Sequence, residues 1–163
     1  MTETMIETKQ YSILVVDDDD IIRDSIVGYL ENFHEASYTL SVDQCADSPE
    51  AVQMITDNTY DLIISDINLP TENGFHVLQT SKKLHPETKT VLITAYKVND
   101  YIRNAKETGI FNIIAKTAPF NFDELSDVVN HLLEPETCFG LDNYLDEKAE
   151  IEKMTITKSD EIM

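Results

Sequence analysis

Short apolar runs alternate along this chain with longer stretches in which apolar residues recur at helical spacing. Continuous apolar runs rich in β-branched residues are typical of strands buried on both faces, as in a parallel sheet. A weaker, more polar run at 40–42 predicts a strand nearer an edge of the sheet. The stronger runs lie at residues 13–16, 62–64, 91–93 and 113–115.

The stretches between these runs predict helices. The first places Ile22, Ile26, Tyr29, Leu30 and Phe33 on one helical face. Signals for helix ends accompany the others: an Asp-Ser-Pro-Glu start at 47–50, a proline stop at 86, a glycine stop at 109 and a capping box at 121–124. The apolar positions of these further helices lie within 51–55, 75–84, 98–105 and 122–132.

Five strand–helix units with short connections imply right-handed crossovers and an α/β, doubly wound fold. We therefore predict a five-stranded parallel sheet of order 2-1-3-4-5 with helices on both faces, over residues 10–134. The alternation stops after Pro135. We expect residues 135–163 to form a C-terminal extension: a linker, a strap docked on the domain, or the start of a missing output module.

Charge and composition exclude several classes of protein. The chain has 12 Lys and Arg against 31 Asp and Glu, a formal net charge of −19. Direct nucleic-acid or anionic-membrane binding requires clustered basic residues, so neither is expected. The sequence has no secretion signal at its start and no apolar run near the ~20 residues of a membrane span, which makes a cytoplasmic protein the expectation. Cys45 and Cys138 stand far apart and indicate neither a disulfide framework nor a zinc site.

Polar side chains that carry chemistry follow four of the five predicted strands. An acidic run, Asp17 to Asp20, follows the first, Asp66 the third, Thr94 the fourth and Lys116 the fifth. The carboxyl ends of parallel strands share one edge of the sheet, so these groups should converge. A single Asp at such a position is more often a helix cap, and we expect capping of the first helix by Asp19 and Asp20.

Carboxylates gathered in one crevice repel one another unless a cation joins them. Oxygen ligands with room for water suit Mg²⁺, and a carboxylate beside the metal can attack phosphorus to form an acyl phosphate. Positioning and charge neutralisation by a metal, a lysine and a hydroxyl then suffice for phosphoryl transfer. The four glycines are isolated, so no Gly-rich phosphate-binding loop is present.

The ordered set of these residues resembles the receiver domain of two-component response regulators, over residues 10–134. The resemblance is carried by the segment through Asp18 with Arg23, by 65–70 with Gly74, by Thr94 and by Lys116. It implies that Asp66 accepts a phosphoryl group from a histidine kinase or a histidine phosphotransfer protein.

The resemblance also implies how the other site residues act. Asp17 and Asp18 are acidic metal-site residues, and Asp18, Asp66 and the backbone carbonyl of Asn68 would be the direct Mg²⁺ ligands. Thr94 and Lys116 would each bind a phosphoryl oxygen. The Asn68 side chain would tune the lifetime of the acyl phosphate, and Tyr96 would partly shield the same site or be a surface aromatic without a role.

Two features depart from the family pattern. Receivers usually have proline directly after the lysine, whereas Thr117 and Ala118 separate Lys116 from Pro119 here. The aromatic residue that usually rotates when the hydroxyl residue moves falls at Ile113, which has no ring. We therefore expect movement of Thr94 to be read out through the fourth helix and its loop, or through the insertion.

Three hypotheses for function remain at this point. The first is a phosphoacceptor signalling domain with at most self-phosphorylation and self-dephosphorylation activity. The second is an aspartyl-phosphate phosphohydrolase, but such enzymes usually have a second Asp two residues after the nucleophile, where this chain has Asn68. The third is a phosphorylation-independent pseudo-receiver. No DNA-binding helix pair follows, so we expect output through a downstream protein or a missing output domain, with a homodimer left open.

Overall fold

The computed structural model describes residues 9–33, 37–95 and 112–135. The predicted fourth helix at 98–105, Tyr96, Cys138 and the C-terminal extension from residue 136 lie outside these ranges. Among the described residues, no helix has the length and apolar character needed to cross a membrane. The elements are β1 (Lys9–Val16), α1 (Asp20–Glu31), β2 (Tyr38–Cys45), α2 (Ser48–Asp57), β3 (Leu62–Asp66), α3 (Gly74–Leu84), β4 (Lys89–Thr94), β5 (Ile113–Ala115) and α5 (Phe122–Leu133).

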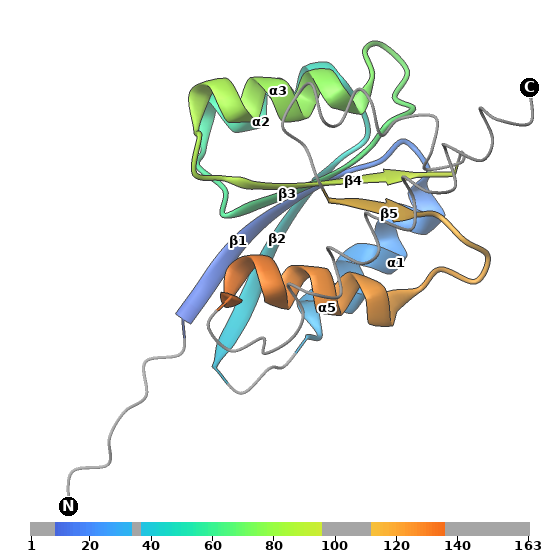
Figure 1. The fold of residues 1–163 in the computed structure, drawn as a ribbon. Coiled ribbons are helices and arrows are strands. Elements are labelled where there is room, and N and C mark those ends of the chain that lie inside the picture. Colours follow the sequence, from blue (N-terminus) through green and yellow to red (C-terminus); the bar gives the residue numbers. More distant parts are fainter. Residues whose placement is uncertain (1–8, 34–36, 96–111, 136–163) are drawn as a thin grey trace, which may run out of the picture.

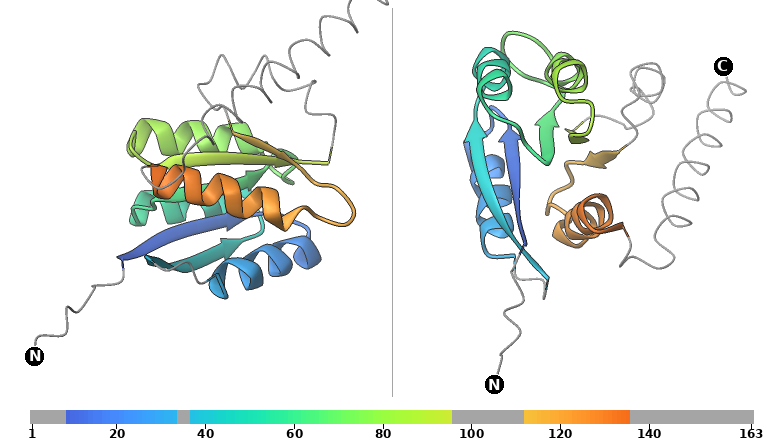
Figure 2. Two further views of the ribbon diagram at one scale, coloured as in Figure 1. Left: turned by 60° about the horizontal axis from the view of Figure 1, so that its bottom comes forward. Right: turned by 90° about the vertical axis from the view of Figure 1, so that its left-hand side faces the viewer.

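The five strands form one parallel sheet of order β2-β1-β3-β4-β5, which confirms the predicted topology (Figure 1). Helices α2 and α3 cover one face, and α1 and α5 cover the other (Figures 1 and 2). Along β1, Ile13 and Val15 belong to the core on the α1/α5 side, whereas Leu14 and Val16 belong to the core on the α2/α3 side. Both faces of the strand are buried, which is why its apolar run is continuous.

The edge strand β2 extends well beyond the predicted run at 40–42. It pairs with β1 along eight residues, from Lys9 opposite Tyr38 to Val16 opposite Cys45. Ser41 and Asp43 on β2 are exposed. These polar residues interrupt the apolar pattern of the strand, although it pairs with β1 along its full length. Its place at the edge was correctly predicted.

The predicted start signals cap their helices, except that Asp20, also expected to cap the first helix, is instead the first residue of α1 and pairs with Arg23. The side chain of Asp19 accepts hydrogen bonds from the backbone N–H groups of Ile21 and Ile22 at the start of α1. Asp47 caps α2 and Asn121 caps α5, each by accepting from the backbone N–H three residues later. These contacts satisfy amide groups that a helix cannot satisfy internally.

The strand register brings the predicted site residues to one edge. Val16 pairs with Ser65, so Asp17 and Asp66, which follow them, lie on neighbouring strands. Asp66 pairs in turn with Ile93, the residue before Thr94. Thr94 pairs with Ala115, the residue before Lys116. Four segments far apart in the sequence therefore end side by side.

Substitutions of Asp19 test how much its cap stabilises α1. We expect Asp19→Ala to lower the free energy of unfolding by about 1 kcal/mol, because two amide groups lose their acceptor. Asp19→Asn should retain most of the stability, since an Asn side chain accepts the same bonds. Urea denaturation of both variants measures the difference. Equal destabilisation by Asn and Ala would show that the charge of Asp19, not its cap, stabilises α1.

Candidate functional site

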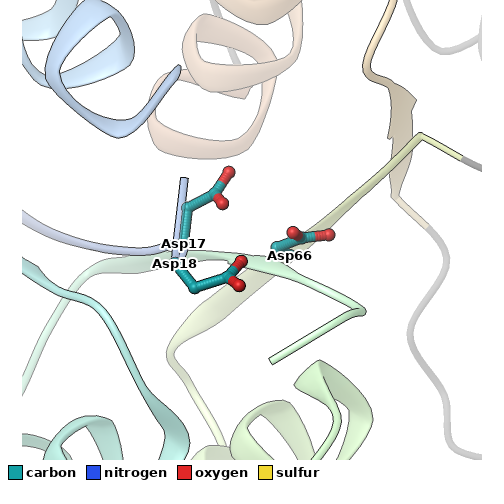
Figure 3. Close-up of side chains that lie close together, drawn as sticks. All are labelled: Asp17, Asp18 and Asp66. Atoms are coloured by element: carbon teal, nitrogen blue, oxygen red, sulfur yellow. The ribbon is translucent and has the colours of Figure 1, made fainter. Parts of the chain in front are cut away.

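Three carboxylates meet at the carboxyl ends of β1 and β3. Oxygen atoms of Asp17, Asp18 and Asp66 all lie within 4.8 Å of one another (Figure 3). Asp17 and Asp66 are buried, whereas Asp18 is exposed and faces solvent at the rim. Because like charges at this spacing repel, the cluster has the character of a cation site.

Lys116 supplies the positive charge of the cluster. Its Nζ lies 2.8 Å from Asp17 Oδ2 and 2.8 Å from Asp66 Oδ2, and its side chain is only 7% exposed. Burial by itself lowers the pKa of this ammonium, but the two carboxylates outweigh burial and raise the pKa above its ordinary value. Lys116 is therefore charged at neutral pH and offsets one of the three negative charges.

Asp17 is the most deeply buried member of the cluster. Burial raises the pKa of its carboxyl, and the neighbouring Asp66 raises it further, against the opposing effect of Lys116. Asp17 Oδ1 also accepts a hydrogen bond of 2.9 Å from the backbone N–H of Asp19. Both carboxylate oxygens of Asp17 thus have protein partners, one an amide and the other the Lys116 ammonium.

Asp66 is held from its backbone and from its side chain. Its Oδ1 accepts a hydrogen bond of 3.3 Å from the backbone N–H of Asn68, and its backbone carbonyl accepts one of 3.0 Å from Ser65 Oγ. The start of α3 lies directly against it: a Cβ atom built on Gly74 would be 2.0 Å from the Asp66 carbonyl oxygen. Gly74 is therefore required by this close approach of two backbone segments.

Thr94 and the segment after β5 complete the edge. Thr94 is fully buried, and its carbonyl accepts a hydrogen bond of 2.7 Å from the backbone N–H of Lys116. In the inserted segment, Thr117 Oγ1 donates to the carbonyl of Pro119, and the Ala118–Pro119 peptide is cis. The insertion leaves Lys116 in contact with Asp66.

Two other predicted residues have surroundings that differ from those of the carboxylates. Asn68 is exposed and follows Asp66 in the loop to α3. Ile113 is half-buried and packs on the apolar core on the α2/α3 side of the sheet. Tyr96 lies outside the described residues.

Sequence reasoning missed the partners that hold the loops of the site. The sequence gives Arg23 no role beyond the family resemblance, yet its Nη1 donates to the carbonyl of Asp17 and its Nε donates to Gln44 Oε1. The buried Ser48 accepts a hydrogen bond from the backbone N–H of Glu72, which ties the loop after β3 to the start of α2. Such contacts depend on tertiary geometry, and no residue spacing in the sequence predicts that Gln44 and Ser48 make them.

Comparisons with known proteins agree with this geometry. The model of the response regulator receiver domain family matches residues 13–130. Sporulation initiation phosphotransferase F of Bacillus subtilis is 31% identical over 121 residues, which cover 74% of this chain and 92% of that protein. The DNA-binding transcriptional regulator NtrC of Azospirillum brasilense is 31% identical over 127 residues, which cover 77% of this chain but 25% of that protein.

Solved structures show the same fold. The crystal structure of response regulator protein TrrA from Thermotoga maritima, in complex with Mg(2+)-BeF, matches with a TM-score of 0.64 and 31% identity. The match covers 75% of this chain and 98% of that chain. Chemotaxis response regulator CheY4 of Vibrio cholerae matches with a TM-score of 0.65 and 25% identity, over 76% of this chain and 99% of that chain.

The packing at Gly74 predicts opposite outcomes for two glycine substitutions. Gly74→Ala should lower the free energy of unfolding by about 3 kcal/mol, because the new methyl group meets backbone atoms of Asp66 that cannot move cheaply. Gly28→Ala, in the interior of α1, meets nothing within 4 Å and should raise stability by roughly 0.5–1 kcal/mol. Urea denaturation of both variants checks the pair. A Gly74→Ala protein as stable as wild type would contradict the close approach of α3 to Asp66.

Proposed function

This chain belongs to the family of response regulator receiver domains, and we propose on that basis that it is a phosphoacceptor whose acceptor residue is Asp66. Domains of this family are signalling domains. The proposed donor is the phosphohistidine of a histidine kinase or a histidine phosphotransfer protein. The observation that carries the proposal is the approach of Asp17, Asp18 and Lys116 to the Asp66 carboxylate.

The donor set favours Mg²⁺ as the cofactor. Three carboxylates and one ammonium leave a net charge of −2 that a divalent cation balances, and carboxylate oxygens are ligands that Mg²⁺ prefers. Asp18 and Asp66 are proposed as direct ligands, together with the backbone carbonyl of Asn68. Asp17 has both of its oxygens engaged by Lys116 and Asp19, which favours a contribution through charge and bound water. When bound, the metal would neutralise charge on the transferred group.

The proposed reaction forms one bond and breaks one. An oxygen of the Asp66 carboxylate attacks phosphorus, an O–P bond forms, and the P–N bond of the phosphohistidine breaks. The electron pair of that bond stays on the imidazole, which leaves as the neutral ring with one proton at its other nitrogen. The Lys116 ammonium, 2.8 Å from Asp66 Oδ2 before transfer, is proposed to pair with a phosphoryl oxygen afterwards.

The remaining roles are assigned by position. Thr94, at the end of β4, is proposed to bind another phosphoryl oxygen, and its inward movement is the proposed switch. Ile113 lacks a ring to follow that movement, so the proposed readout passes through the segment after β4 or the insertion after Lys116. The side chain of Asn68 is proposed to tune the lifetime of the acyl phosphate, with Tyr96 as a second tuning residue.

Phosphorylation is proposed to switch contacts with a downstream protein or a further domain. The chain covers most of the length of the phosphotransferase it matches but a quarter of the length of the transcriptional regulator. The proposal therefore concerns the receiver chemistry and leaves the output to other segments or proteins. Asn68, in place of a second carboxylate, disfavours a phosphohydrolase, and the contacts between Lys116 and Asp66 disfavour a pseudo-receiver.

Intact-mass analysis after treatment with acetyl phosphate tests the proposal. With Mg²⁺ present we expect one phosphoryl group per chain, carried on Asp66 and released by hydroxylamine, as an acyl phosphate requires. Chelation of the metal with EDTA should abolish the adduct, because the charge repulsion in the cluster is then unrelieved. Asp66→Asn should give no adduct.

The matched control is Asp57→Asn, which removes an exposed carboxylate at the end of α2. This variant should be labelled like wild type. An adduct that persists in Asp66→Asn would contradict the assignment of the acceptor. Continuous release of phosphate from many esters would favour the hydrolase, and labelling of neither wild type nor control would favour the pseudo-receiver.

A further inference from the structure

Arg23 connects three segments around the start of the acidic run. Its Nη1 donates a hydrogen bond of 2.7 Å to the backbone carbonyl of Asp17, and its Nη2 lies 2.7 Å from Asp20 Oδ1. Its Nε donates a bond of 2.9 Å to Gln44 Oε1 on β2. The side chain is 14% exposed, so a charged group projecting from the first turn of α1 is largely covered. The planar guanidinium uses its fixed donor geometry to reach all three acceptors.

These contacts fix the peptide group that precedes Asp18. The carbonyl of Asp17 belongs to the Asp17–Asp18 peptide, and Arg23 holds its oxygen. On the other side of Asp18, the backbone N–H of Asp19 donates to Asp17 Oδ1. The backbone N–H of Arg23 itself donates 2.9 Å to the carbonyl of Asp19. The Asp18 side chain is exposed, and its position is therefore set by the hydrogen bonds that hold the backbone before and after it.

We infer that Arg23 is a positioning residue for the metal site: it locks the turn between β1 and α1 so that the Asp18 carboxylate stays beside Asp66. The inference rests on the proposed Mg²⁺ site. Arg23 is itself positively charged, and its charge alone would weaken Mg²⁺ binding at the proposed site. A guanidinium close to a divalent cation repels it, so the benefit of Arg23 must come from geometry.

A role through charge and a role through geometry therefore predict opposite changes in Mg²⁺ affinity when Arg23 is replaced. If Arg23 acted only through its charge, its removal would tighten Mg²⁺ binding, and a lysine in its place would leave binding unchanged. If Arg23 holds the turn, Arg23→Met weakens Mg²⁺ binding by roughly 10–100-fold, the usual effect of losing a partner outside the direct ligands. Arg23→Lys should weaken it too, because an ammonium cannot reproduce the three-way contact.

The experiment is a calorimetric Mg²⁺ titration of the full chain for wild type, Arg23→Met, Arg23→Lys and the control Lys9→Met. Lys9 lies at the opposite end of β1, and Lys9→Met removes one positive charge far from the cluster. It should leave the Mg²⁺ dissociation constant unchanged. Gln44→Ala, which keeps the guanidinium but removes its anchor on β2, should give an intermediate loss. Gln44→Ala therefore tests the role of Arg23 even if Arg23→Met does not fold.

Amide hydrogen exchange without metal provides a second readout. In Arg23→Met the amide of Asp19 should exchange faster than in wild type, while amides in the centre of β3 keep their protection. Tighter or unchanged Mg²⁺ binding in Arg23→Met, with wild-type binding intact, would overturn the inference alone. A fall in stability with an unchanged dissociation constant would reduce Arg23 to a structural role and also overturn it. Absence of Mg²⁺ binding in the wild type would overturn the proposed function and this inference together.

Discussion

Like-charge repulsion at the carboxyl ends of β1 and β3 is the constraint on which the site depends. Two of the three carboxylates are buried, and burial makes their charge more costly than it is in water. A single ammonium, that of Lys116, reaches Asp17 and Asp66 at once. Among the described residues, one positive charge against three negative charges leaves the cluster incompletely neutralised, and that imbalance is the basis of the proposed divalent-cation site.

The rest of the fold keeps this unfavourable arrangement in place. The apolar cores on the two faces of the sheet hold β1 and β3 in a register that aligns Val16 with Ser65, and so brings Asp17 beside Asp66. Gly74 lets α3 begin in contact with the backbone of Asp66. Hydrophobic burial on the two faces of the sheet thus supplies the free energy that opposes the repulsion at its edge. Functional sites commonly hold such local conflicts between groups.

Much of the fold and of the candidate site could be predicted from the sequence, because both follow from simple periodicities. Runs such as 13–16 and 62–64 indicate buried parallel strands, and parallel strands place the residues after them on one edge. What could not be predicted depends on tertiary contacts. The full length of β2 follows from its pairing with β1 and not from its own apolar content. The guanidinium of Arg23 meets Gln44, 21 residues away, through geometry that no local pattern encodes.

The most direct measurement of the central claim is the free energy of unfolding as a function of Mg²⁺ concentration, against NaCl of equal ionic strength. We predict one-site stabilisation of the wild type, with about 1.4 kcal/mol gained for each tenfold rise in Mg²⁺ above its dissociation constant. Asp66→Asn should lose most of this gain, because a proposed direct ligand and one unit of repulsion are both removed. Equal stabilisation by NaCl, or a full Mg²⁺ response in Asp66→Asn, would contradict the claim that these carboxylates form a divalent-cation site.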